Sequence, residues 1–408
     1  MTPLGVLLSA ASAVLAVPTT VFSLECLLGY ADGSERRFSA RPPGKRMTIL
    51  VPAHDEEAGL PATLTALREE LAPDDEILVV ADNCSDRTAE VARSAGATVV
   101  ERFDKERRGK GYAVTFGLDA LAADPPDVVI IVDADCQLQK GSLELLTAAA
   151  LESGRPVQAD YTMTLPAGAD FKTRISVFAF RVRNRVRPRG LARLGGPCHL
   201  AGTGMAFPWA ILREAMPMGD DLAEDLMLAA DLCLRGHYPL LLPQAIVESE
   251  LAQSRSGQVV QRQRWEQGHL ATLRRAVPKL VKSWLQGKDK RSLLMALDIG
   301  VPPLTLHVLL LCLVLMAAGL LALLGGSVTP LSISLAQFLL LLVALSLTWS
   351  GHGRDVLPLR RLLTIPLYIA WKIPLYLHMM VFGGARSWVR TDRTTTSPGA
   401  SGSGAHAH

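Results

Sequence analysis

Uncharged apolar runs lie near the two ends of the chain. The first covers residues 4–23, and two more cover residues 304–324 and 331–349. A helix of about 20 apolar residues can cross the hydrocarbon core of a bilayer. A secretory signal peptide fits the first run poorly, because no basic residue precedes it. The pattern predicts an N-terminal transmembrane anchor within 1–30 and two transmembrane helices within 296–350.

Basic residues around these runs predict the orientation. Arg36, Arg37 and Arg41 follow the first run, and Arg354 and Arg360 follow the third. Lysine and arginine accumulate on the cytoplasmic side of a membrane. We therefore expect a multi-pass protein of the inner (cytoplasmic) membrane, with its N-terminus outside and its central region in the cytoplasm.

Two C-terminal segments have patterns of their own. Residues 360–384 are apolar but interrupted by proline, lysine and histidine. An interfacial or re-entrant helix fits them better than a fourth span, which would place the basic residues that follow outside. Residues 394–408 are rich in serine, glycine and alanine and are predicted to be a disordered tail.

Between the apolar ends, residues 45–255 alternate between strand-like and helix-like patterns. Short apolar strands are predicted at 47–51, 77–80, 98–101 and 128–132, and the helices between them at 57–71, 86–94 and 111–121. Ser85 is the expected N-cap of the second helix. Strands separated by helices of this length form a doubly wound, mostly parallel α/β sheet. Residues 256–290 read as basic amphipathic helices at the membrane interface.

Charge and cysteine content narrow the function. A net charge of +3 is too small to suggest a nucleic-acid partner. The six cysteines show no Cys-x-x-Cys spacing, so they indicate neither a zinc site nor a disulfide framework and suit a reducing cytoplasm.

Two aspartates close the predicted strand 128–132. Asp133 and Asp135 come directly after five β-branched residues. Open α/β sheets bind ligands at the carboxyl ends of their strands. Carboxylates so placed can hold a hard divalent cation and, through it, a diphosphate. A solitary pair of this kind can also simply cap the next helix.

Four further patterns accompany the two aspartates. They are VPAHDEE at 51–57, ADNCSD at 81–86, GTGM at 202–205 followed by AED at 223–225, and QRQRW at 261–265. In this order the patterns resemble the family 2 glycosyltransferases. Within that family the chain looks like the membrane-integrated branch of cellulose, hyaluronan and poly-N-acetylglucosamine synthases and ceramide glucosyltransferases. The family often has Asn where this chain has Asp55 and a second acid where it has Ala81, which leaves the donor base less certain.

The resemblance implies a GT-A-like catalytic domain with a UDP-sugar donor and Mg2+ or Mn2+. Asp82 would accept from the uracil N3–H group, and Asp135, with Asp133, would bind the metal. The implied nucleotide-sugar site comprises Ala53, Glu57, Asp82, Lys110, Asp133, Asp135, Gln261, Arg264 and Trp265. Structural roles compete with these: a turn or helix-capping residue at Asp82 and a membrane-interface anchor at Trp265.

Asp225 is the implied catalytic base. It would deprotonate the acceptor hydroxyl and invert the α-linked donor to a β-linked product. The acceptor would contact Gly202, Thr203, Gly204, Glu224 and Trp265. Glu224 could equally stabilise the start of a helix expected at 222–235. Alternating arginines from Arg181 to Arg189 suggest contact with anionic lipid headgroups or a charged acceptor, with a solvated face as the alternative.

The expected function is transfer of a sugar from a UDP-sugar to a lipid-linked or growing polysaccharide acceptor, in exopolysaccharide or cell-envelope glycoconjugate synthesis. A single-transfer glycolipid synthase is one alternative, because the QRQRW motif does not decide processivity. A catalytically inactive nucleotide-binding membrane scaffold is another. Expected partners are the lipid bilayer, a second copy of the chain or other polysaccharide-assembly proteins.

Overall fold

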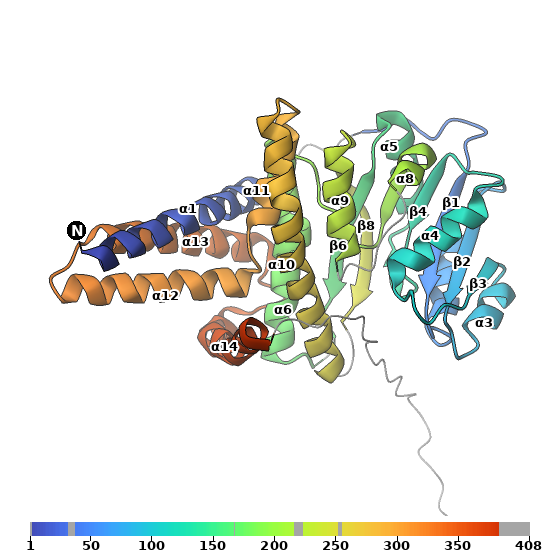
Figure 1. Ribbon diagram of the computed structural model, residues 1–408. Helices are drawn as coiled ribbons and strands as arrows, with labels where there is room; N and C mark the ends of the chain where they lie inside the picture. Colours follow the sequence, from blue (N-terminus) through green and yellow to red (C-terminus); the bar gives the residue numbers. More distant parts are fainter. Residues whose placement is uncertain (1, 32–36, 167, 216–222, 252–254, 383–408) are drawn as a thin grey trace, which may run out of the picture.

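The chain forms a sheet domain joined to a bundle of apolar helices (Figure 1). The computed structural model describes residues 2–31, 37–166, 168–215, 223–251 and 255–382. The predicted disordered tail, 394–408, therefore lies outside the described residues.

Three long helices make up the bundle. They are α1 (Pro3–Gly29), α12 (Leu304–Leu323) and α13 (Thr329–His352), and each is long and apolar enough to cross a membrane. Polar side chains join them inside the bundle: the Ser12 and Ser334 hydroxyls lie 2.8 Å apart, and Thr19 Oγ1 lies 2.9 Å from His307 Nε2. The three helices match the three apolar runs of the sequence.

The sheet has eight strands in the order β3-β2-β1-β4-β7-β6-β8-β5. The first four are β1 (Met47–Ala53), β2 (Glu76–Asp82), β3 (Thr98–Arg102) and β4 (Val128–Ile131), and their pairings with one another are parallel, as predicted. The others are β5 (Cys136–Leu138), β6 (Val157–Thr164), β7 (Met205–Pro208) and β8 (Leu240–Glu250). Strand β7 runs antiparallel to both β4 and β6, and β5 runs antiparallel to β8.

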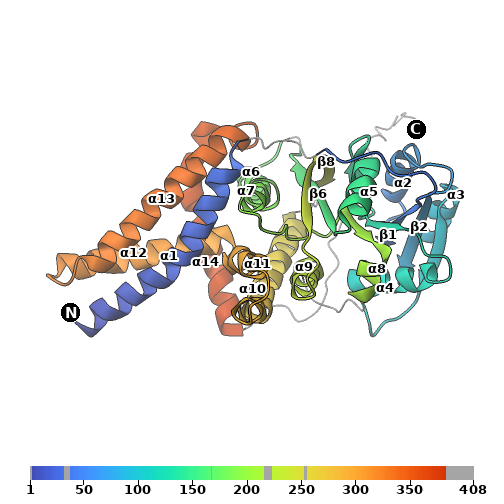
Figure 2. The ribbon, with the colours of Figure 1, turned by 90° about the horizontal axis from the view of Figure 1, so that it is seen from above.

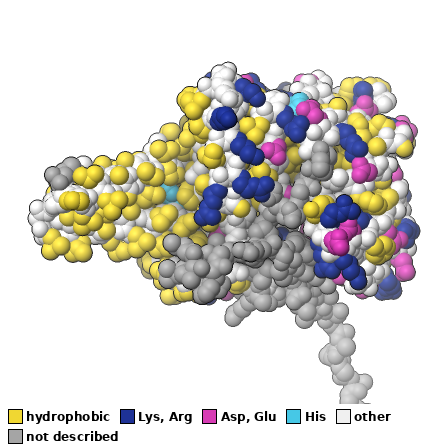
Figure 3. Space-filling view, viewed as in Figure 1, with side chains coloured by type: hydrophobic (Ala, Val, Ile, Leu, Met, Phe, Trp, Pro, Cys, Tyr) yellow, Lys and Arg dark blue, Asp and Glu magenta, His cyan; other side chains and the backbone are white. Residues whose placement is uncertain are grey.

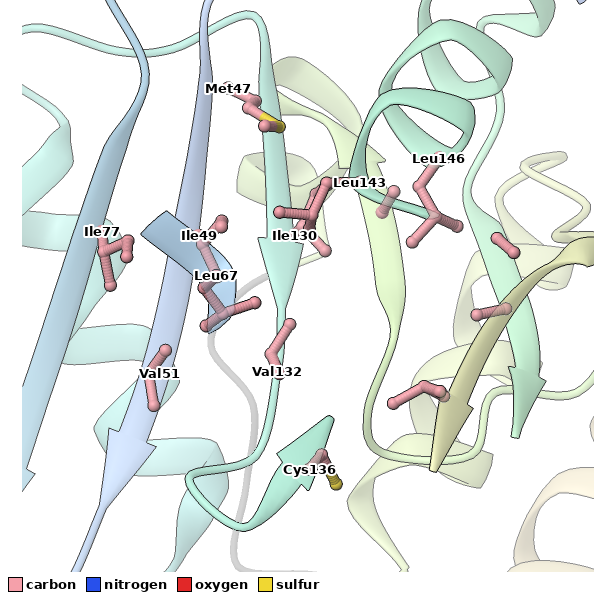
Figure 4. Packing of buried hydrophobic residues seen from close by; sticks show 14 of the residues in the cluster. Met47, Ile49, Val51, Leu67, Ile77, Ile130, Val132, Cys136, Leu143 and Leu146 are labelled. Carbon is pink, nitrogen blue, oxygen red and sulfur yellow. The ribbon is translucent and has the colours of Figure 1, made fainter. Parts of the chain in front are cut away.

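Helices cover both faces of the sheet, and both faces are buried. Alternate residues of a strand point to opposite faces, so each strand contributes to two apolar layers. Ile49 and Ile130 face α2 (Leu60–Arg68), α3 (Thr88–Ser94) and α5 (Ser142–Ser153), as Figure 4 shows in part. Leu50 and Ile131 face the other layer, which contains α4 (Lys110–Leu121), α8 (Trp209–Glu214) and α9 (Glu224–Leu234).

The predicted Ser85 cap is wrong. Helix α3 begins at Thr88, two residues later than expected. The Ser85 backbone N–H donates instead to Asp55 Oδ1, at 2.6 Å, and Asp86 Oδ1 accepts from the Thr88 N–H, at 2.9 Å. Ser85 thus ties the end of β2 to the end of β1.

A layer of helices separates the sheet from the bundle (Figures 1 and 2). It contains α6 (Phe171–Arg181), the π-helical turn η1 (Val182–Val186), α7 (Arg187–Arg193), α10 (Arg255–Leu285) and α11 (Lys290–Gly300). The last elements are η2 (Leu359–Thr364) and α14 (Ile365–Phe382). Helix α14 runs across the direction of the three bundle helices (Figure 1).

The alternating arginines mostly form ion pairs inside the protein. Arg185 and Arg189 both pair with Asp160, whose side chain is buried. Arg187 pairs with Glu25 of α1 and with Asp298 of α11, at 2.6 Å each. These ion pairs therefore connect the sheet domain to the bundle, and the three arginines form neither the lipid-facing row nor the solvated face that the sequence suggested as alternatives.

Candidate active site

The ends of β1, β2 and β4 border one cavity of about 750 Å3. This is where the carboxyl ends of parallel strands gather, and where α/β sheets bind ligands. Eight of the predicted donor residues line it: Ala53, Glu57, Asp82, Lys110, Asp133, Asp135, Gln261 and Arg264. The sheet and α10 thus bring together residues that are more than two hundred positions apart, such as Ala53 and Arg264.

Lys110, the first residue of α4, connects two parts of the site. Its ammonium group forms an ion pair with Asp133 and donates to the Gly202 carbonyl oxygen at 2.6 Å. Burial is the largest influence on this charge and disfavours it, but Asp133, Glu224 and Asp225 together raise the pKa of Lys110. The predicted donor lysine therefore stays charged between the metal motif and the Gly-rich loop.

The Gly-rich loop, residues 202–205, supports Asp133 through a hydrogen bond to its backbone. Gly202 and Gly204 have φ angles of +91° and +62°, a region that L side chains rarely adopt. Between them Thr203 is fully buried, and its hydroxyl accepts from the Asp133 backbone N–H at 3.1 Å. A Cβ on Gly204 would lie only 2.8 Å from Val247 Cγ1. Gly204 thus permits a close approach of the loop to the strand that contains Val247, and both glycines permit the positive φ angles.

Asp225 lies beside this cluster, in the first turn of α9. A Cβ placed on Gly202 would be 3.4 Å from Asp225 Oδ2 and 3.7 Å from Lys110 Nζ, so the carboxylate and the ammonium share one neighbourhood. Burial, and next the Asp225 carboxylate, raise the pKa of Glu224 to about 7.

The donor atoms at the end of β4 suit a hard divalent cation. One ligand atom from each of Asp133, Asp135 and Cys136 lies within 4.8 Å of the others. Burial raises the pKa of the Cys136 thiol well above its usual value, so the carboxylate oxygens are the available ligands. Carboxylate oxygens favour Mg2+ or Mn2+ over softer metals.

Asp82 closes the end of the cavity formed by β2. Its Oδ1 accepts from Arg102 Nη1 at 2.6 Å and from Asn83 Nδ2 at 2.9 Å. Burial raises the pKa of Asp82, and Arg102 opposes this shift. Nearby, Glu57 accepts from the Arg87 backbone N–H at 3.1 Å, which ties the first motif to the start of α3.

The QRQRW motif divides between two environments. Gln261 and Arg264 line the cavity, and Gln261 is only 9% exposed. Trp265 lies outside that lining and packs with its ring centroid 5.6 Å from that of Phe180, in the apolar cluster next to the bundle. Of the three motif residues predicted to bind the donor, Trp265 is therefore the one that does not line the cavity.

Sequence reasoning missed two charged residues of this region. Arg102 ends β3 directly opposite Asp82 in the strand register, and only the sheet order reveals that pairing. Arg183 interacts electrostatically with Asp225; burial lowers the pKa of Arg183 and the carboxylate opposes the shift. The run of alternating arginines marked Arg183 but did not distinguish it from its neighbours.

Comparisons with known proteins agree with this geometry. The model of glycosyl transferase family 2 matches residues 48–200, and that of glycosyl transferase family group 2 matches residues 128–350, more than half of the chain. A mannosyltransferase from Pyrobaculum calidifontis, solved in complex with GDP-Man and Mn2+, has a similar fold. The TM-score is 0.55 at 18% identity, covering 90% of this chain and 98% of the other.

Curated relatives match a shorter part of this chain, about a quarter of its length. An uncharacterized glycosyltransferase of Mycobacterium tuberculosis is 39% identical over 105 residues, covering 26% of this chain and 44% of the relative. A 4,4'-diaponeurosporenoate glycosyltransferase of Staphylococcus aureus is 35% identical over 106 residues, covering 25% of this chain and 27% of the relative. This chain thus spans less than half the length of these relatives.

The expected GT-A-like fold is therefore confirmed, with a mostly parallel sheet and three apolar helices beside it. By its matches over both the sheet domain and the bundle, the chain belongs to the family 2 glycosyltransferases.

Proposed function

We propose that this protein is an inverting, metal-dependent hexosyltransferase. It would move a sugar from a UDP-sugar to a lipid-linked or growing polysaccharide acceptor at the inner membrane, with the catalytic domain in the cytoplasm. The observation that carries the proposal is the convergence of Asp133, Lys110 and Asp225 around Gly202, beside a cavity large enough for a nucleotide sugar.

The nucleotide would occupy the cavity between β1, β2 and α10. Asp82, held by Arg102, would accept from the uracil N3–H group, while Ala53 and Glu57 would border the ribose. Lys110 and Arg264 would face the diphosphate with positive charge. These roles rest on position along the cavity and on the family motifs.

Asp135 and Asp133 would hold Mg2+ or Mn2+. A cation there supplies charge neutralisation of the departing UDP, worth several kcal/mol of barrier. Asp225 would take the proton from the acceptor hydroxyl while the oxygen of that hydroxyl forms a bond to the anomeric carbon of the donor sugar. The bond from that carbon to the diphosphate breaks at the same time, which gives a β-linked product.

The acceptor would approach from the membrane side, along Gly202, Thr203, Gly204 and Glu224. Trp265 would also contact the acceptor, with a ring that is half-buried and packs against Phe180. The segments proposed to act at the membrane are α1, α12 and α13 as spans, and α10 and α14 as interfacial helices. The crossing direction of α14 supports the interfacial placement (Figure 1).

A donor screen tests the proposal. The full chain, purified in detergent, is incubated with a panel of UDP-sugars and with GDP-mannose, each with Mg2+ or Mn2+, and nucleotide release is measured. GDP-mannose belongs in the panel because the Pyrobaculum calidifontis enzyme was solved with it. Release from a UDP-sugar supports the proposal, and release from GDP-mannose alone would overturn the donor assignment.

The proposed base has a matched control on its own helix. Asp225→Asn should abolish transfer and leave UDP binding intact, whereas Asp231→Asn, on the same helix α9, should leave both unchanged. Loss of UDP binding in Asp225→Asn would assign that residue to the donor.

Two alternatives remain as outcomes of these assays. The Staphylococcus aureus relative is named for one defined acceptor compound, which favours keeping single transfer as a candidate. One added sugar per acceptor would establish single transfer, and a ladder of products would establish polymer synthesis. UDP binding without turnover of any donor would indicate a membrane scaffold.

A further inference from the structure

A second cavity lies at the boundary between the sheet domain and the bundle. Its volume is about 340 Å3, and it is lined by Gly168, Ala169, Arg174, Pro358, Arg360 and Arg361. It therefore joins the segment before α6 to η2, the short helix that follows α13. Among the described residues, none lines both this cavity and the proposed donor cavity.

Arg174 is held in place by the protein backbone. Its Nη1 donates to the Val356 carbonyl oxygen at 2.9 Å, and its Nε donates to the Ala169 carbonyl oxygen at 3.2 Å. A guanidinium has five N–H donors in a fixed plane. The two bonds orient this plane beside the cavity and leave the group with its full positive charge.

The charge of the cavity is unbalanced. Three of its six lining residues are arginines, and none of the described lining residues is acidic. The nearest acidic groups in the sequence are engaged elsewhere: Asp170 caps α6 by accepting from the Thr173 N–H, and Asp355 pairs with Arg181. Three arginines around one cavity, with no carboxylate among its described lining residues, favour an anion with several oxygens, such as a phosphate.

Apolar side chains flank the same arginines. Leu359 is 67% exposed and Leu363 is 86% exposed, on either side of Arg360 and Arg361 in η2. Exposed leucines next to arginines match the boundary between acyl chains and headgroups in a membrane. Figure 3 shows the apolar surface of the bundle giving way to charged side chains where it meets the helical layer.

We propose that this cavity binds the phosphate headgroup of an anionic phospholipid. The arginines would bind the phosphate, and Leu359 and Leu363 would lie against the acyl chains. Because η2 follows α13 and Arg174 belongs to α6, the bound lipid would fasten the membrane segment to the sheet domain. This inference does not depend on the donor or the reaction.

Lipid binding to the full chain in detergent tests this site. Native mass spectrometry would measure the dissociation constants of phosphatidylglycerol and of phosphatidylcholine. The variant R360Q/R361Q removes two charges of the cavity but keeps Arg174, whose bonds support the fold. The matched control, R354Q/R274Q, removes two exposed arginines outside the cavity and gives the same net charge.

The wild type should prefer phosphatidylglycerol, and R360Q/R361Q should bind it roughly 30-fold more weakly while the control stays unchanged. Equal weakening in both double variants would overturn the site, because it would reflect overall charge. Equal binding of the two lipids would also overturn it. Displacement of the lipid by millimolar inorganic phosphate would contradict a lipid ligand and indicate a soluble anion.

Discussion

Lys110 forms an ion pair with Asp133 and also donates to the Gly202 carbonyl oxygen at 2.6 Å. One ammonium group therefore joins the end of β4 to the Gly-rich loop beside Asp225. In the proposed reaction the same charge would face the departing diphosphate.

Lys110→Gln should lower kcat/KM by about 10²–10³, because it keeps a hydrogen-bond donor but removes a charge that opposes the leaving group. Initial-rate kinetics with the best donor measure this. Lys105→Gln, an exposed residue in the loop before α4, should behave as wild type. Equal activity of wild type and Lys110→Gln would remove Lys110 from the donor site.

Gly202→Ala should inactivate the enzyme through local crowding. The new methyl group would lie 3.4 Å from Asp225 Oδ2 and 3.7 Å from Lys110 Nζ, where an acceptor hydroxyl must fit. Gly141→Ala is the control: its φ is +85°, close to the +91° of Gly202, but no atom lies within 4 Å of its Cβ. Both variants should lose about 1–2 kcal/mol of stability, and only Gly202→Ala should lose transfer. Comparable activities would show that Gly202 matters for backbone shape alone.

Arg187→Met should destabilise the junction between the anchor and the catalytic domain. It removes the shared partner of Glu25 and Asp298 and leaves two carboxylates buried, which costs about 3–5 kcal/mol. Arg93→Met, which breaks an exposed pair with Glu101, should change stability by less than about 1 kcal/mol. Thermal unfolding in detergent gives both values, and a similar small change in the two variants would mean that the buried triad does not hold the junction.

The raised pKa of Glu224 predicts that the stability of the protein depends on pH. Its pKa is about 7 in the folded protein and 4.5 in its ordinary state. A raised carboxyl pKa means that the folded state binds the proton more tightly. Protonation of Glu224 therefore stabilises the folded state. This contribution is complete below pH 4.5 and is lost as the pH rises through about 7. Melting temperatures from pH 5 to pH 8 should fall more steeply for wild type than for Glu224→Gln. Parallel curves would place the Glu224 pKa near its ordinary value.

The parallel half of the sheet could be predicted because its strands alternate with helices and are apolar on both faces, as in β1 and β4. The other half, in which β6 and β8 are parallel and β5 and β7 antiparallel to their neighbours, could not. Strand β7 returns next to β4 only after more than seventy residues, and strand order over such distances leaves no local pattern in the sequence.

The same limit applies to the site. Asp133, Asp135 and Asp225 belong to motifs that can be recognised in the sequence. In the structure Lys110 pairs with Asp133, and Gly202 lies beside Asp225 and Lys110. Arg102 has no motif, because its role comes from strand register with Asp82. Trp265 shares helix α10 with Gln261 and Arg264. Its ring nevertheless packs against Phe180, because its side of α10 faces the apolar cluster next to the bundle.

UDP binding to wild type and Asp135→Ala, measured by calorimetry with Mn2+ or with EDTA, tests most directly whether carboxylates and a cation bind the donor. The surface variant Asp119→Ala serves as control. Wild type and control should bind UDP with Mn2+ and lose at least about tenfold in affinity with EDTA, and Asp135→Ala should bind equally weakly in both. Undiminished UDP affinity in Asp135→Ala, or in wild type with EDTA, would contradict the account.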